Sequence, residues 1–349
     1  MDNGKIKKLL IAEGALLILL LIAALVARFV ILRPGAEAPQ TEPEQTAASD
    51  SAIQVWATEV TEPENTEASV PTEPEPEPDP EPLLEEMELS ARNAFAYRLE
   101  SDTLYYLQGG WTTPIYPASV TKLFSAYVAL QYLDPEAVIT AGDELDLVPE
   151  HSSIAYINKG NKLTVSMLVE GMLLPSGNDA AHILAAAAAR KASGNPEMAA
   201  EDAVAYFVDM MNGTAQSLGM TGSHFRNPDG YHNEDHYTCV RDLITIARLA
   251  LENEIISQYA RLCEDEVVYA SGHTNHWNNT NLLINPDSKY YRAEAVGLKT
   301  GSTTAAGNCL LSAFSVDGEY IIVGVFGCEE KTDRFADTLQ VYQAVLNVW

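Results

Sequence analysis

The sequence predicts an α/β (α+β) domain over residues 86–349, built as an antiparallel sheet flanked by helices. Two short strand-like runs, 94–99 and 103–106, open this region, and two more, 310–316 and 320–326, lie near its end. Segments with helical spacing of apolar residues lie between the two pairs of strands. Strands at both ends with helices between them predict one sheet whose edges come from the two termini of the domain.

Five helices are predicted within this domain. The segment 119–133 places its apolar residues on one face at helical spacing. The segment 179–192 is almost entirely alanine, so we expect a helix that is buried against close neighbours. The other three helices are expected over 202–218, 238–251 and 333–347.

The N-terminus has the pattern of a membrane anchor. Three lysines occur in residues 1–8, and the apolar run 9–32 is interrupted only by Glu13 and Arg28. At about 1.5 Å per residue this run is long enough to span a bilayer. The lysines favour a cytoplasmic N-terminus and an outside C-terminus. We therefore expect a short cytoplasmic segment and then a single-pass transmembrane signal anchor, with a signal peptide cleaved after the small residues at 36–38 as the alternative.

Residues 33–85 are predicted to be a disordered linker. The stretch 34–88 carries sixteen acidic residues and no lysine or arginine, and proline recurs throughout it. Such a composition cannot bury enough apolar surface to fold, and charge repulsion keeps it extended. The formal net charge of the chain is −28. Because binding to phosphates needs a basic face, nucleic acid is excluded as a partner.

The cysteines and histidines do not predict a metal or redox site. The four cysteines have no CxxC spacing, and a domain of this size does not need disulfides. If Asp317-Gly318 forms a two-residue turn, Cys309 and Cys328 fall on one face as diagonal neighbours, roughly 7 Å apart, which is awkward for a disulfide. The i, i+4 pair His232 and His236 follows turn residues, so a loop is expected there rather than a metal-binding helix.

Ser119-x-x-Lys122 is the first motif that carries chemistry. It opens an apolar helix, so Ser119 lies where the helix dipole and free backbone N–H groups stabilise negative charge. The i, i+3 spacing places Lys122 on the same face. A serine hydroxyl becomes a nucleophile when a base takes its proton, and a desolvated, neutral lysine is such a base. The alternative is an N-cap serine followed by a surface lysine.

Ser176-Gly177-Asn178 is the second motif, at the start of the alanine-rich helix. Its hydroxyl and amide, two residues apart, can face one cavity. Ser176 could then pass a proton between Lys122 and a leaving amine, and Asn178 could hydrogen-bond a substrate amide. The alternative is a simple turn and helix cap. The same tripeptide recurs at 193–195 in a polar stretch between helices, where we expect only a turn.

Lys299-Thr300-Gly301 is the third motif. Lys299 is expected to be a second cation near Lys122, where it lowers the pKa of Lys122 and attracts a carboxylate. Thr300 offers a hydroxyl to the same carboxylate, and Gly301 lets a substrate backbone approach closely. The alternative is an ordinary beginning of a strand.

Taken together, the three motifs in this order resemble those of β-lactamases and penicillin-binding proteins. The resemblance is nearest to the serine-type D-alanyl-D-alanine carboxypeptidases, the low-molecular-mass penicillin-binding proteins of peptidase family S11. It covers nearly all of residues 90–349 and includes Pro-Ala-Ser-Val-Thr-Lys at 117–122, Leu-Pro-Ser-Gly-Asn-Asp-Ala-Ala at 174–181, Asn-Pro-Asp-Gly at 227–230, and Gly-Leu-Lys-Thr-Gly-Ser-Thr at 297–303. It implies a β-lactamase/transpeptidase-like fold.

By this resemblance Ser119 is the nucleophile, Lys122 the general base and Ser176 the proton relay. The substrate-binding residues are then Asn178, Lys299, Thr300, Gly301, Ser302 and Arg334. Backbone N–H groups of Ser119 and Ser302 would form the oxyanion hole, and Arg334, at the matching distance beyond the third motif, would bind the terminal carboxylate. Ser302 stands where many members carry histidine or tyrosine.

The implied reaction is hydrolysis of D-alanyl-D-alanine in peptidoglycan stem pentapeptides through a Ser119 acyl-enzyme, without metal or cofactor. β-Lactams are the expected inhibitors, and the catalytic domain would lie on the cell-wall side of the cell membrane. Three alternatives remain: a D,D-endopeptidase or transpeptidase with the same site, a β-lactamase, and a non-catalytic membrane-tethered β-lactam sensor. A class A β-lactamase needs a glutamate in a Glu-x-x-Leu-Asn setting, which the sequence lacks.

Overall fold

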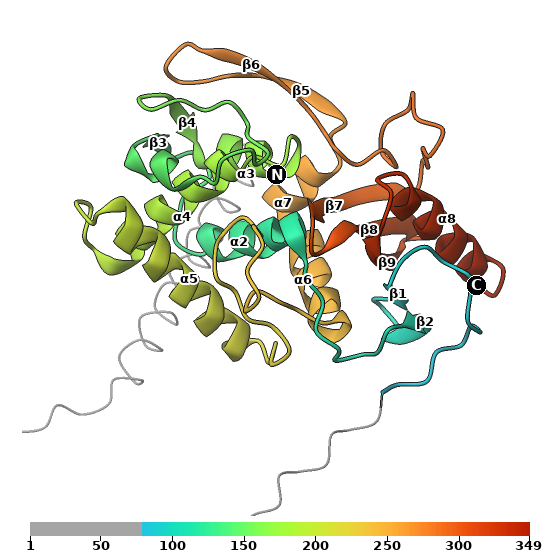
Figure 1. The fold of residues 1–349 in the computed structure, drawn as a ribbon. Coiled ribbons are helices and arrows are strands. Elements are labelled where there is room, and N and C mark those ends of the chain that lie inside the picture. The colour runs from blue at the N-terminus through green and yellow to red at the C-terminus, as the bar shows by residue number, and fades with distance from the viewer. Residues whose placement is uncertain (1–78) are drawn as a thin grey trace, which may run out of the picture. The chain divides into compact units, whose positions relative to one another are not determined.

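A five-stranded antiparallel sheet forms the centre of the computed structural model, which describes residues 79–349 (Figure 1). Its strand order is β2-β1-β9-β8-β7. The predicted antiparallel sheet of N-terminal and C-terminal strands is confirmed, but its predicted edges are wrong: the first and last strands, β1 and β9, pair inside the sheet, and β7, an edge strand, was not predicted. The strands are β1 (Asn93–Arg98), β2 (Thr103–Gln108), β7 (Ala295–Thr303), β8 (Gly307–Val316) and β9 (Glu319–Cys328).

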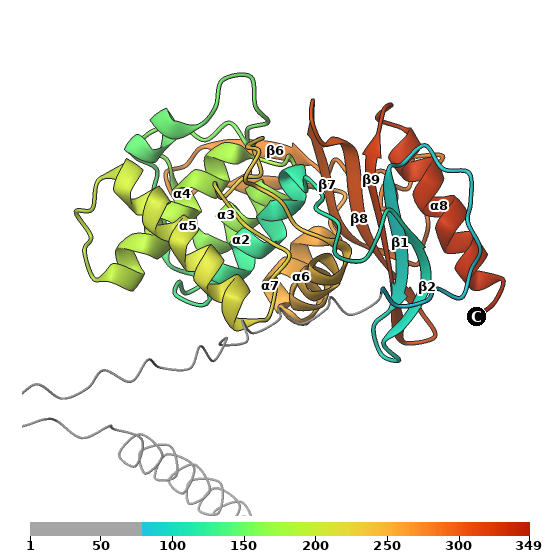
Figure 2. The ribbon, with the colours of Figure 1, turned by 60° about the horizontal axis from the view of Figure 1, so that its bottom comes forward.

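Helices cover both faces of this sheet. Figure 2, which views the sheet nearly edge-on, shows α8 on one face and the remaining helices on the other side. All five predicted helices are present, with ends that differ by up to three residues from those expected, whereas α3 and α7 were not predicted. The helices are α2 (Thr121–Leu130), α3 (Val165–Leu173), α4 (Asn178–Ser193), α5 (Ala200–Ser217), α6 (Val240–Glu252), α7 (Glu254–Ala260) and α8 (Asp333–Leu346).

Two small hairpins lie outside the main sheet and were not predicted. One pairs β3 (Val138–Thr140) with β4 (Lys162–Thr164), and the other pairs β5 (Glu264–Val268) with β6 (Thr274–Asn278). In β5 and in β6 only one residue of five is buried. A strand exposed on both faces lacks the alternation of apolar and polar residues that identifies strands in a sequence.

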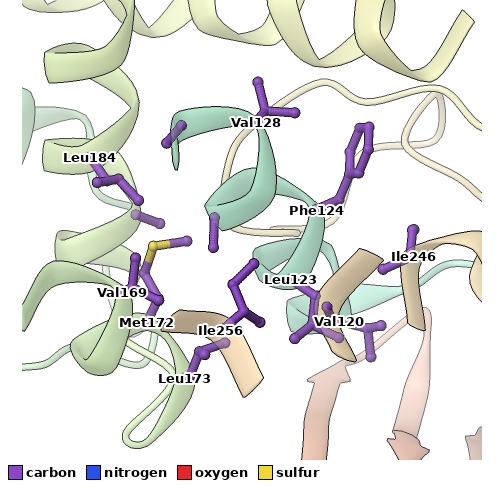
Figure 3. Close-up of a cluster of buried hydrophobic side chains, with 14 of the residues drawn as sticks. Val120, Leu123, Phe124, Val128, Val169, Met172, Leu173, Leu184, Ile246 and Ile256 are labelled. Carbon is purple, nitrogen blue, oxygen red and sulfur yellow. The ribbon is translucent and has the colours of Figure 1, made fainter. Parts of the chain in front are cut away.

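Helix α2 runs through the middle of the larger hydrophobic core. Val120, Leu123 and Phe124 lie among side chains of α3, α4, α6 and α7 (Figure 3). Eight of its ten residues are buried, as expected for a helix that is surrounded by protein. One of these buried residues is Lys122. A helix that crosses the core therefore places a lysine where water cannot solvate it.

The cysteine geometry expected from the sequence is wrong in one respect. The two-residue turn at Asp317-Gly318 is present, since Val316 pairs with Glu319. However, the register shifts between Asn308 and Leu310. As a result the Cys309 thiol lies in the core on the α2 side of the sheet, whereas the Cys328 thiol faces α8. All four cysteines are free thiols.

The predictions for residues 1–8 and 9–32, and for most of the linker 33–85, lie outside the described residues. Within the part of the chain that the structure describes, no helix is long and apolar enough to cross a membrane. Near the beginning of the described residues, the backbone N–H groups of Leu83 and Leu84 donate to the carbonyl groups of Leu104 and Tyr105 on β2, at 3.3 and 2.8 Å.

Candidate active site

Ser119 lies in a tight turn at the N-terminal end of α2. A 3₁₀ turn, Ala118–Val120, precedes the helix, which begins at Thr121. The Ser119 side chain is half-buried and lines a cavity of about 600 Å³ that Asn178 and Ser302 also line. Because the free N–H groups and the dipole of a helix concentrate at its N-terminus, negative charge that develops near Ser119 is stabilised there.

Lys122 connects three parts of the site through its amino group. Its Nζ lies 2.8 Å from Ser119 Oγ, 2.7 Å from Asn178 Oδ1 and 2.8 Å from the backbone oxygen of Asp229. The last two atoms only accept hydrogen bonds. A neutral amine has two N–H donors and one lone pair. When Asn178 and Asp229 take both donors, the lone pair faces the Ser119 hydroxyl, as a general base requires.

The environment of Lys122 favours this neutral form. Burial lowers the pKa of its amino group to about 8, although the carboxylates of Asp229 and Asp179 oppose the shift. With that pKa about a tenth of the molecules carry a neutral Lys122 at pH 7. The pKa of Lys299 is also lowered, by burial first and then by the charges of Lys122 and Arg334. The two amino groups are thus near enough to interact, but the pKa of Lys122 is lowered by burial and not, as predicted, by the charge of Lys299.

The turn between α3 and α4 carries the second motif. Asn178 begins α4 and reaches Lys122, whereas Ser176, buried at φ +64°, has no hydrogen bond to Lys122 or Ser119 among the described residues. The structure therefore brings Asn178 to the general base, but it does not hydrogen-bond Ser176, the expected proton relay, to Lys122 or to Ser119. The second Ser-Gly-Asn, at 193–195, is a turn, with Gly194 in the left-handed region as the C-cap of α4, as predicted.

The third motif lies on β7, next to the nucleophile turn. Lys299 Nζ donates to the backbone oxygen of Thr300 at 3.1 Å, and no carboxylate within the described residues forms an ion pair with it. A Cβ on Gly301 would lie 2.9 Å from the oxygen of Pro117 and 3.0 Å from the nitrogen of Ser119. Gly301 therefore allows β7 to pack against the turn, in addition to the substrate contact expected from the sequence.

Arg334 reaches the same end of β7 from α8. Its Nη1 donates to the backbone oxygen of Gly301 at 3.2 Å and to Ser302 Oγ at 3.0 Å. Ser302 Oγ in turn donates to Asn308 Oδ1 at 2.8 Å. The Nε of Arg334 is buried without a hydrogen-bond partner in the described part of the chain. The guanidinium group is thus held in place beside Lys299 with a donor to spare, which suits a carboxylate ligand.

Several residues at the site were missed by sequence reasoning. The backbone oxygen of Asp229 binds Lys122, and the carboxyl group of the same residue faces His182 of α4 at 3.4 Å. Thr280 Oγ1 lies 2.6 Å from Thr300 Oγ1, and Asn308 holds Ser302. The sequence of the stretch 227–230 indicates only a family resemblance and not this contact. No sequence pattern indicates Thr280 or Asn308, because their contacts depend on the path of a loop and on the register of neighbouring strands.

Most of the described domain is similar to known D-alanyl-D-alanine carboxypeptidases. The sequence matches the family described as D-alanyl-D-alanine carboxypeptidase, peptidase S11, over residues 83–330. A D-alanyl-D-alanine carboxypeptidase of Streptomyces sp. (strain K15) is 32% identical over 232 residues, which cover 64% of this chain and 76% of that protein. The carboxypeptidase DacF of Bacillus subtilis (strain 168) is 29% identical over 64% of this chain and 54% of its own length, so the chain spans about half of that relative.

A solved structure agrees with this assignment. The crystal structure of the Streptomyces K15 DD-transpeptidase superposes with a TM-score of 0.68 and 27% sequence identity, covering 76% of this chain and 100% of that one. The α+β fold, with its antiparallel sheet and flanking helices, is therefore the DD-transpeptidase fold. The family match covers more than half of the sequence and includes all three motifs. The chain belongs to the D-alanyl-D-alanine carboxypeptidases of peptidase family S11, a family of serine hydrolases.

Proposed function

We propose that this protein removes the terminal D-alanine from peptidoglycan stem pentapeptides through an acyl-enzyme at Ser119. One observation carries the proposal: Lys122 Nζ lies 2.8 Å from Ser119 Oγ, and its other two polar neighbours, Asn178 Oδ1 and the Asp229 oxygen, only accept hydrogen bonds. This arrangement turns the lone pair of a neutral lysine towards the one hydroxyl that must lose its proton.

The reaction proceeds in two acyl transfers. Lys122 takes the proton from Ser119 while Oγ bonds to the carbonyl carbon of the D-alanyl-D-alanine peptide, and the carbonyl oxygen becomes negative. Backbone N–H groups of Ser119 and Ser302 stabilise that oxygen. The C–N bond then breaks, and the proton held by Lys122 passes, with Ser176 as relay, to the nitrogen of the departing D-alanine. Water deprotonated by Lys122 hydrolyses the ester and restores the Ser119 hydroxyl.

The substrate carboxylate supplies the charge that the site lacks. Lys299 and Arg334 are buried basic side chains without an acidic partner in the described domain. A terminal carboxylate bound by Lys299, Thr300 and Arg334 would compensate both charges and place the peptide bond at Ser119, while Asn178 binds the substrate amide. The carboxylate of a penicillin fits the same group of donors, so β-lactams are expected to acylate Ser119. The proposed reaction uses no metal or organic cofactor.

We also propose that the enzyme is attached to the cell membrane and works on its cell-wall side. The apolar run 9–32 after the lysines of 1–8 supports a single transmembrane helix, and the acidic, proline-rich segment 33–85 supports an extended linker to the catalytic domain 86–349. An N-terminal anchor of this kind would bring the site near newly made peptidoglycan.

The proposal is tested with the full-length protein and two ligands. A stem pentapeptide should lose one D-alanine to give a tetrapeptide, and a fluorescent penicillin should label the protein covalently. A cross-linked dimeric product would favour a transpeptidase, cleavage of cross-linked dimers an endopeptidase, and rapid penicillin turnover a β-lactamase. Stable labelling without any peptide product would favour the sensor and contradict the proposed enzyme.

The acylation rate should depend on pH through Lys122. Because the base must be neutral and burial lowers its pKa to about 8, the second-order rate constant for penicillin labelling should rise as pH rises through about 8 and then level off. Below that value it should fall about tenfold for each pH unit. Stopped-flow or gel labelling from about pH 6 to about pH 9.5 measures the rising limb of this pH–rate curve and its midpoint. A rate that is flat across this range would show that Lys122 is not the base.

Gly230→Ala should disrupt the nucleophile turn. Gly230 has φ +79°, and a Cβ there would lie 1.9 Å from the backbone oxygen of Ala118. The turn that holds Ser119 must therefore move, and a shift of about 1 Å at a reacting group costs roughly 100-fold in rate. Penicillin labelling measures the loss. The matched control is Gly213→Ala in α5, where a Cβ meets nothing within 4 Å; equal losses in both variants would contradict the account.

A further inference from the structure

Behind Lys122 lies a second pair of titratable residues that the reaction above does not use. The Asp229 side chain is 0% exposed and His182 is 5% exposed. His182 Nε2 lies 3.4 Å from Asp229 Oδ2, a contact between the two groups that lacks hydrogen-bond geometry. Neither ring nitrogen of His182 has another partner within the described residues. Two polar groups buried in this way are costly to the fold unless they stabilise each other.

The pair joins the two elements that hold the lysine. Asp229 belongs to the loop whose backbone oxygen accepts from Lys122 at 2.8 Å, and its Oδ1 accepts from the N–H of Tyr231 at 2.9 Å. His182 belongs to α4, one turn after Asn178, whose Oδ1 is the other acceptor, at 2.7 Å. Residues four apart on a helix share a face. The His182–Asp229 contact therefore ties together both acceptors that orient Lys122.

The pair also sets the charge around Lys122. Burial lowers the pKa of Lys122, whereas the carboxylates of Asp229 and Asp179 favour its charged form. Burial by itself would raise the pKa of Asp229, but the contact with His182 and the charge of Lys122 outweigh it, so the pKa of Asp229 is lowered. His236, which also faces this group, is kept neutral by burial, which lowers its pKa to about 4.

We propose, on the basis of the function proposed above, that His182 and Asp229 are positioning residues for Lys122: their contact holds together the two acceptors of its amino group and fixes a carboxylate behind it. Neither residue touches the substrate. The pair acts through the lysine: its contact fixes the direction of the lone pair, and its negative charge makes the amine a stronger base. Loss of either residue should leave the site formed but its pH dependence displaced.

Asp229→Asn is the central variant. It keeps the backbone oxygen that binds Lys122 and an Oδ1 acceptor for Tyr231, but removes the charge. Loss of a neighbouring charge shifts a pKa by about one unit or more. The rising limb of penicillin labelling should therefore move about one pH unit lower. The plateau rate should also fall, because a weaker base accepts the proton less readily.

His182→Leu should move the limb in the same direction. Without the polar imidazole beside it, the buried Asp229 carboxyl takes up a proton more readily, and the charge near Lys122 is again lost. His182→Gln, which retains an N–H donor, should keep the wild-type midpoint. In the double variant of His182→Leu and Asp229→Asn the midpoint should move no further than in Asp229→Asn, because both changes remove one and the same charge.

A matched control is present on the same helix. Arg190 of α4 lies 3.3 Å from the buried carboxylate of Glu144, which is 1% exposed and does not affect the pKa of Lys122. Glu144→Gln removes a buried, paired charge of similar burial and should leave the labelling midpoint unchanged. Circular dichroism and thermal unfolding of every full-length variant establish that the domain is folded.

The outcomes separate this inference from the proposed function. If Asp229→Asn is folded and labels with the wild-type midpoint, the pair has no influence on Lys122 and the inference fails. If Asp229→Asn does not fold, an unshifted midpoint in folded His182→Leu overturns it equally. A midpoint that moves just as far in Glu144→Gln would also contradict it. Absence of labelling in the wild-type protein would contradict the proposed function instead.

Discussion

Replacing Ser119 with alanine should abolish both penicillin labelling and D-alanine release. Ser119 Oγ is the one hydroxyl within hydrogen-bond distance of Lys122 Nζ in the described domain, so it is the hydroxyl that this base can activate. In a serine peptidase, loss of the nucleophile lowers the turnover rate by roughly 10⁴-fold or more. Ser119 is half-buried and small, so alanine should leave the fold intact. Gel fluorescence after labelling and a D-alanine assay measure the two losses.

The control for this prediction is Ser217→Ala. Ser217 is exposed near the end of α5, and its hydroxyl binds only the backbone oxygen of Thr214. This variant should label and release D-alanine at the wild-type rate. Labelling of Ser119→Ala at a rate near that of the wild type would mean that another residue is acylated.

Lys122→Met should lower the acylation rate about 1,000-fold, since a positioned general base contributes roughly 10²- to 10⁴-fold. Methionine has a similar length but offers no lone pair to take the proton of Ser119. The change removes a buried amine, which is costly to keep charged, yet it leaves Asn178 Oδ1 and the Asp229 oxygen without their donor. These effects oppose each other, so thermal stability should change much less than activity. Slow-acylation kinetics at high penicillin concentration measure the residual rate.

An exposed lysine gives the comparison for this variant. Lys191, in the last turn of α4, is exposed and forms no ion pair within the described residues. Lys191→Met should acylate as the wild type does. If Lys122→Met retains more than about a tenth of the wild-type rate, the barrier is not controlled by a base at this position.

Much of the fold could be predicted because its elements bury one face or all of their surface. The alanine-rich helix α4 and the strands β8 and β9 show this in their composition, and each was expected within three residues of its observed bounds. The hairpin β5–β6 was missed because it is exposed on both faces. The placement of Cys328 was wrong because a shift in strand register is set by backbone geometry, which residue types do not reveal.

The site was predictable where a short motif carries the side chains at a recognisable spacing. Ser119, Lys122 and Asn178 were identified by spacing and are joined by hydrogen bonds of 2.7 to 2.8 Å. The third ligand of the lysine is a backbone oxygen, that of Asp229, and any residue type supplies one, so the sequence held no signal for it. His182 was missed for another reason. A single histidine in an apolar helix has no partner in the sequence, because Asp229 is 47 residues away and only the fold brings them together.

Peptide mapping by mass spectrometry is the most direct test of the central claim that Ser119 is the acylated nucleophile. The full-length protein is treated with a penicillin, digested and analysed for the mass of one bound ligand. We expect a single adduct, on the peptide that contains Ser119, and its loss when the protein is first incubated with excess stem pentapeptide. An adduct on any other residue, or labelling that the pentapeptide does not reduce, would contradict the account.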